Sequence, residues 1–139
     1  MELYNHTRAQ FAGQNVDLTA LKVMLVGAGY TFAATETAMT AATAAEVSGN
    51  GWAAGGPTIA NVTESVVNTN EGQIDGDDIS VTASGGDIGP ASGLVVYDSI
   101  SGKPLFYDTF ASAQTAGDGT PFNITWDATF GIYTVEAPA

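Results

Sequence analysis

Turn-forming residues recur at regular intervals along this sequence, and that spacing limits it to one broad class of fold. Short apolar runs recur between clusters of Gly, Asn, Asp and Pro, roughly every 8–12 residues, as in antiparallel sandwiches and barrels. Runs such as 23–26 and 94–97 are too short for a buried helix and suit a strand. We therefore predict an all-β fold, an antiparallel β-sandwich or barrel of about eight short strands.

The individual strands follow from alternation with a period of two and from the turns that bound it. Within residues 16–26, Leu21, Val23 and Leu25 fall on one face of an extended chain and the residues between them fall on the other. The other expected strands lie at residues 46–47, 52–59, 61–68, 79–83, 91–98, 104–110, 122–126 and 131–135.

The chain of 139 residues has the length of one domain, and we find no internal repeat or linker. Residues 1–14 are expected to form an N-terminal arm and residues 15–139 a single β-sandwich domain. At most one short helix is expected, within the Ala- and Thr-rich residues 31–46, because threonine favours helices weakly. A surface loop is the alternative for that segment.

The charge balance excludes several kinds of partner. Only Arg8, Lys22 and Lys103 are cationic, against 15 Asp and Glu, for a net charge of -12. Binding a nucleic-acid backbone or an anionic membrane surface requires clusters of cations, so we expect neither as a partner. Residues 1–6 have no cationic start and no apolar run, so we also expect no secretory signal.

The sequence offers little for catalysis. It contains no cysteine, and His6 is the single histidine, which rules out a zinc site built from His and Cys and gives no support to a Ser-His-Asp triad. Gly27-Ala28-Gly29 follows a strand, but Phe32 stands where a dinucleotide fingerprint needs a small residue. We expect no enzyme activity and no cofactor.

One acidic cluster raises the question of calcium. Asp75, Asp77 and Asp78 follow Asn68, Asn70 and Glu71, but the ligand spacing of an EF-hand is not met. Aspartate and asparagine also cap turns, so a hairpin loop explains the same residues. We therefore predict no metal site.

Aromatic residues occur on most of the expected strands, where they are more often core than ligand platform. An exposed Trp52 or Trp126 would instead mark a carbohydrate-binding β-sandwich module. Tyr4 and Phe11 precede the first strand. They either anchor in a neighbouring subunit or fold back over their own sheet, and the sequence leaves both readings open.

The order of these segments over nearly the full length resembles a family of small structural proteins of tailed bacteriophages. The resemblance is carried by Leu3-Tyr4-Asn5, residues 16–18 and 21–26, Tyr30, Glu46-Val47-Ser48-Gly49-Asn50-Gly51-Trp52, Gly55-Gly56, residues 93–98, residues 104–110, residues 122–126 and Gly131-Ile132.

The resemblance implies a virion component assembled in the host cytoplasm and brings no catalytic residues. We expect a capsid decoration (cement) protein that binds the major capsid protein, or another virion protein, as a homo-oligomer, with a trimer favoured. A tail, baseplate or fibre-associated domain is the alternative within the virion. The candidate assembly interface comprises Leu3, Tyr4, Phe11, Phe32 and Met39.

Overall fold

The computed structural model describes residues 2–8, 17–68 and 71–135, and it confirms the all-β class. The strands are β1 (Glu2–Leu3), β2 (Leu21–Val26), β3 (Glu46–Val47), β4 (Thr63–Asn68), β5 (Glu71–Asp75), β6 (Ile79–Thr82), β7 (Ile88–Asp98), β8 (Lys103–Ala116), β9 (Pro121–Ile124) and β10 (Tyr133–Val135). Neighbouring strands pair antiparallel in every sheet. No helix in the described part of the chain is long and apolar enough to cross a membrane.

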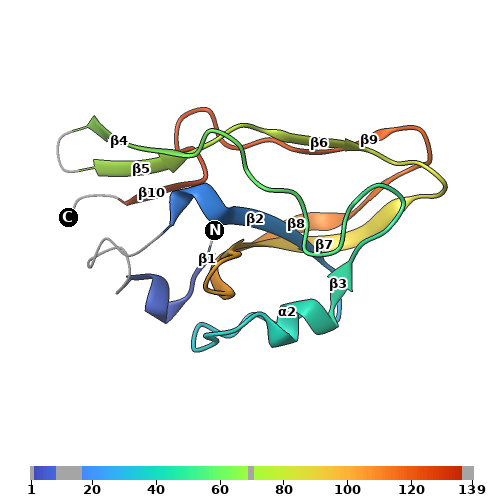
Figure 1. Cartoon of the computed structure of the whole chain (residues 1–139), viewed down its shortest axis with the longest axis horizontal. Helices are drawn as coiled ribbons and strands as arrows, with labels where there is room; N and C mark the ends of the chain where they lie inside the picture. Colours follow the sequence, from blue (N-terminus) through green and yellow to red (C-terminus); the bar gives the residue numbers. More distant parts are fainter. Residues whose placement is uncertain (1, 9–16, 69–70, 136–139) are drawn as a thin grey trace.

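The strands form two layers, with a thin third layer of loop and helix (Figure 1). The central layer is a five-stranded sheet in the order β1-β8-β7-β2-β3. Above it in the view run the three-stranded sheet β10-β5-β4 and the two-stranded sheet β6-β9, placed end to end. Below it lies the segment that leads from β2 through α2 (Thr40–Ala44) to β3.

The alternation in β2 places side chains on both faces of the central sheet. Leu21, Val23 and Leu25 are fully buried against the upper layer, whereas Met24 and Val26 belong to a second cluster on the opposite face. Both faces of β2 are therefore covered, and only Lys22 is partly exposed. The predicted alternation is confirmed, and burial on both sides makes β2 the centre of the fold.

The two faces of the central sheet carry two separate cores. The larger lies between the strand layers and includes Trp52, Phe106, Phe122 and Trp126. The smaller, which we call the tyrosine cluster, lies between the sheet and residues 27–45. Its members are Tyr4, Met24, Val26, Tyr30, Ala42, Val95 and Tyr97, with Phe32, Met39, Ala45 and Tyr107 packed against them.

The structure departs from the expected strands at several places. Residues 52–59 make only isolated bridges, because Gly55, Gly56 and Pro57 interrupt the run while it crosses beside β2. β5 occupies residues where we expected a turn, and β7 and β8 extend well beyond the predicted ends. The added residues of β7 and β8 include glycine and polar residues. They lack the alternation of apolar residues from which strands were predicted.

The helical content also differs from the expectation of at most one short helix. α2 covers only five residues of the Ala- and Thr-rich segment, and the rest is loop. A short 3-10 helix, η1 (Leu18–Ala20), precedes β2 and is capped by the side chain of Asp17, which accepts a hydrogen bond from the Thr19 amide. Residues 5–8 form a further helical turn.

The N-terminal residues are part of the domain, not a separate arm, as far as the structure describes them. β1 pairs with β8, and Leu3, Tyr4 and Thr7 are buried. The Thr7 hydroxyl donates to the Leu105 carbonyl oxygen at 3.1 Å. Of the two interpretations left open, residues 2–8 follow the one in which the segment folds back over its own sheet.

Candidate functional site

One hollow of the described surface lies between β8 and β9. It has a volume of about 470 Å³ and is open to solvent. Its floor consists of apolar side chains of the main core, among them Leu94, Phe122, Ile124 and Trp126, each at most 8% exposed. Asp108, Gln114, Thr115, Asn123 and Thr125 supply the polar part of the lining.

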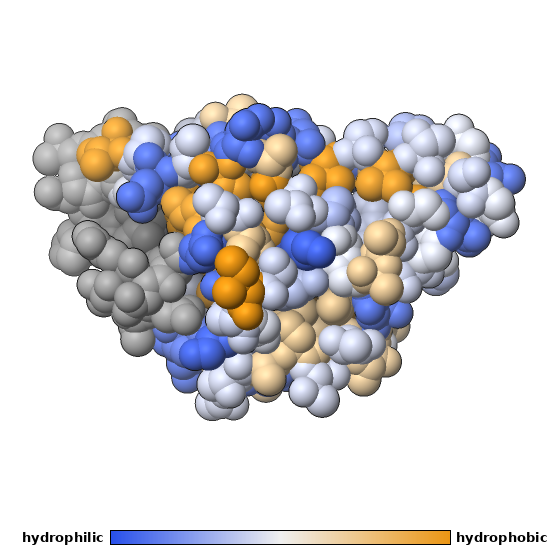
Figure 2. Space-filling model, viewed as in Figure 1, coloured by the Kyte–Doolittle hydropathy of each residue, from blue (hydrophilic) through white to orange (hydrophobic). Residues whose placement is uncertain are grey.

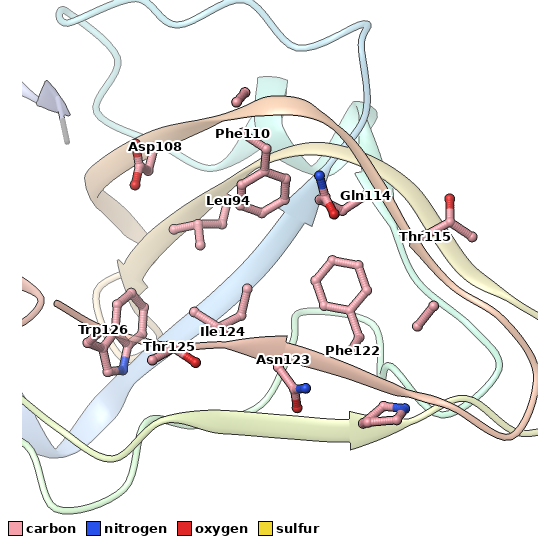
Figure 3. A pocket seen from close by; sticks show the side chains of 13 residues that line it. Leu94, Asp108, Phe110, Gln114, Thr115, Phe122, Asn123, Ile124, Thr125 and Trp126 are labelled. Atoms are coloured by element: carbon pink, nitrogen blue, oxygen red, sulfur yellow. The ribbon is translucent and has the colours of Figure 1, made fainter.

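A bulge in β8 shapes this hollow. The register between β7 and β8 shifts so that Ala91 lies opposite Gln114 and Gly93 opposite Thr109, which leaves residues 110–113 without counterparts on β7. Extra residues of this kind bend a strand away from its neighbour. Figure 3 shows β8 arching over the hollow, with Phe110 and Phe122 pointing toward one another; their ring centroids are 6.5 Å apart.

A second hollow of about 500 Å³ adjoins the first and shares Asp108, Thr125 and Trp126 with it. It continues beside the chain that leads from β9 to β10, where Asp127, Phe130 and Ile132 join the lining. Together the two hollows make one elongated depression, which we call the β8–β9 furrow. An elongated, open shape fits an extended ligand better than a compact small molecule.

Neither tryptophan is an exposed platform. Trp52 is fully buried and packs edge-on against Phe122, with ring centroids 5.5 Å apart. Trp126 is 8% exposed, and its indole N–H donates to the Asp77 carbonyl oxygen at 2.9 Å. The carbohydrate-binding alternative therefore loses the two residues on which it rested.

Four of the five candidate interface residues lie in the described part of the chain, and all four take part in packing. Leu3 belongs to the main core and Tyr4 to the tyrosine cluster, so neither offers much surface to a partner. Phe32 and Met39 pack against the tyrosine cluster and are partly exposed. Phe11 lies outside the described residues.

Part of the acidic cluster lies at a hairpin, because Asn68 ends β4 and Glu71 begins β5, which pairs with β4. Asp75, Asp77 and Asp78 lie farther along the chain, on the link between β5 and β6, two strands of different sheets. Asp75 accepts from the Gly76 amide, Asp77 accepts from the side-chain amide of Asn61, and Asp78 accepts from the Trp126 amide. Within the described ranges no group of three or more His, Cys, Asp or Glu could hold a metal ion. These carboxylates brace the link between the sheets.

The tyrosine cluster contains a chain of buried hydroxyl groups. The Tyr4 and Tyr30 hydroxyls are hydrogen-bonded, and the Tyr30 hydroxyl donates to Glu36 Oε2 at 3.2 Å. Burial raises the pKa of Tyr30 to about 12, and burial together with the bond to Tyr30 raises the pKa of Tyr4 well above its usual value near 10. The folded chain therefore holds both phenolic protons where the unfolded chain releases them.

This retention predicts alkaline destabilisation. Below about pH 10 both states keep the protons, and as the pH rises from 10 toward 12 only the unfolded state loses them, so the free energy of unfolding falls. Tyr4→Phe is expected to reduce the slope of that fall by about one proton. Urea unfolding at several pH values measures the slope. Equal slopes for the variant and the parent would contradict the prediction, and data at pH 7 separate ionisation from any packing defect.

The β4–β5 hairpin is a weaker candidate surface. Val66 on β4 is 81% exposed, and a hollow of about 440 Å³ lies along the same strands, lined by Glu64, Gln73 and Ile74 among others. Figure 2 shows apolar residues in a broken band at the level of the upper layer on this face of the molecule. The furrow differs from this surface because core side chains form its floor.

The fold and the furrow together define an all-β domain with an open side between its two strand layers. In comparisons with known proteins, no family model, no curated protein and no solved structure matches the chain. Sequence reasoning missed the furrow, although Phe110, Phe122 and Trp126 were among the aromatic residues of the expected strands. A bulge in one strand leaves no pattern in the spacing of apolar residues.

Proposed function

We propose that this chain is a structural protein of a tailed-bacteriophage virion, bound to the outer surface of the capsid as a decoration protein. The observation that carries the proposal is the β8–β9 furrow, a surface with core side chains at its floor and polar side chains in its lining, suited to another protein. The order of sequence segments that resembles phage structural proteins supports the viral setting. A homo-oligomer, with a trimer favoured, is part of the proposal.

The furrow supports binding and assembly better than catalysis. Its ionisable side chains are those of Asp108, Asp127 and Tyr133. The Asp127 carboxylate accepts hydrogen bonds from the backbone amides of Thr129 and Phe130. Those bonds lower the pKa of Asp127, so it stays anionic at neutral pH and is poorly suited to exchange protons in a reaction.

Electron microscopy of purified phage particles that carry a labelled copy of this chain tests the proposal. We expect label in a regular pattern over the head, and we expect particles that lack the chain to release their DNA at a lower temperature. Label confined to the tail would favour the tail or baseplate alternative. Particles without label, from cells that produce the chain in soluble form, would overturn a virion role.

A further inference from the structure

We propose that the β8–β9 furrow binds an extended, cationic segment of a partner protein by strand addition. The segment would lie between the edges of β8 and β9 and close the open side of the sandwich. This inference deepens the proposed function, because it names the binding mode and the chemistry of the partner segment. It rests on that function only for the identity of the partner as a virion protein.

The first argument comes from the backbone. Among the described strands, β1 pairs with β8 at Phe106 and Tyr107, and β7 is the partner of β8 from Asp108 onward, except at residues 110–113. β9 pairs with β6 on one side and with no described strand on the other. Unpaired edges present rows of N–H and C=O groups that an incoming extended chain can use. The furrow therefore has a backbone edge on each of its two sides.

The second argument comes from the floor. A strand added to a sandwich turns alternate side chains inward, and those side chains need apolar partners. Leu94, Ile124 and Trp126 lie beneath the opening, and Phe110 and Phe122 form an aromatic pair in its lining (Figure 3). An occupant with an apolar residue at every second position would extend the main core to this side of the molecule.

The third argument comes from charge. Asp108 and Asp127 line the furrow, and Arg8, Lys22 and Lys103 do not. A second copy of the chain would bring another net charge of -12 to this surface, which opposes self-association through the furrow. A segment in which lysine or arginine alternates with apolar residues would place cations near these carboxylates and in solvent.

The test uses the full chain and a ten-residue synthetic peptide in which lysine alternates with valine. In NMR titrations we expect saturable shifts of the amide signals of residues 108–116 and 121–126. The same peptide with glutamate in place of lysine is expected to bind at least 10-fold more weakly. A peptide N-methylated at alternate residues is expected not to bind, because it cannot pair with a strand edge.

Two variants with the same charge change locate the site. Ala111→Arg puts a cation and a long side chain at the furrow and is expected to weaken binding at least 10-fold. Ala41→Arg makes the identical change on exposed α2, on the other side of the central sheet, and is expected to leave binding unchanged. Unchanged amide spectra away from each mutation establish that both variants fold.

Several outcomes would overturn the inference: no saturable shift, shifts that map outside the furrow, equal binding of the glutamate peptide, or undiminished binding by Ala111→Arg. The result is separable from the proposed function. Label on phage heads with no peptide binding would leave the virion role standing and remove strand addition. Peptide binding together with unlabelled phage particles would support strand addition and remove the virion role.

Discussion

Gly56→Ala is expected to unfold the protein or to destabilise it by more than about 4 kcal/mol, which is exceptional for one substitution. Gly56 has a φ of 77°, a backbone conformation that residues other than glycine rarely adopt. A Cβ there would lie 1.6 Å from the Val23 carbonyl oxygen, which is backbone in the central strand β2. Because the Val23 amide donates to the Pro57 carbonyl oxygen at 3.1 Å, neither segment can move aside freely.

Gly29→Ala is the matched control. Gly29 is exposed, and an added Cβ there meets no atom within 4 Å. The free energy of unfolding of the Gly29→Ala variant is expected to stay within about 0.5 kcal/mol of that of the parent. Urea unfolding followed by far-ultraviolet circular dichroism measures both variants. A Gly56→Ala protein with the midpoint of the parent would show that the segment before β4 does not need its close approach to β2.

Trp52→Ala is expected to cost about 3–5 kcal/mol, the usual range for removing a large buried aromatic side chain. Trp52 is fully buried in the main core and contacts Phe122 at the furrow floor. Its indole nitrogen has no hydrogen-bond partner among the described residues. Removing a buried donor that makes no bond offsets part of the loss of packing.

Trp52→Phe separates these two effects. It keeps an aromatic ring against Phe122 and removes the unpaired N–H, so a cost of about 1–2 kcal/mol is expected. Urea unfolding of both variants, with Trp126 as the remaining fluorophore, gives the comparison. Equal stabilities of the alanine and phenylalanine variants would contradict the packing role assigned to the ring.

The effects at Gly56 and Trp52 bear on the furrow, since both residues support the layers that border it. Trp52 backs Phe122 on β9, and the segment around Gly56 holds β2 on the side away from β7. Strand addition is therefore best studied with surface substitutions such as Ala111→Arg, which leave the core intact.

Local patterns in the sequence were sufficient for the class of fold and for several strands. The alternation of residues 21–26 predicted β2 and its two faces, and the residues of β6 showed the same period. Tight turns were also visible, as at Gly49-Asn50-Gly51, where Asn50 has a φ of 55°. These features depend on residues near one another in the chain, so the sequence displays them directly.

Contacts between distant segments were beyond the reach of local patterns. Tyr4 looked like part of an arm, but its hydroxyl meets that of Tyr30, 26 residues away, inside the tyrosine cluster. Trp52 and Trp126 could each be core or platform until the strand layers were placed. Whether a residue is buried depends on which segments pack against it, and those contacts depend on the topology of the whole chain.

The turn-punctuated, alternating sequence by itself determined an antiparallel all-β protein with an acidic surface and few cations. Only the tertiary structure decided that residues 2–8 pack onto the domain, with residues 2–3 in the sheet, that both tryptophans are internal, and that one side of the sandwich is open. The two-residue alternation of apolar side chains and the turn residues that bound each run predict strands, because both depend only on neighbouring residues. Strand edges, bulges and the furrow depend on which strands pair and in what register. Pairing joins segments that are distant in the sequence, so the pattern of one segment does not predict it.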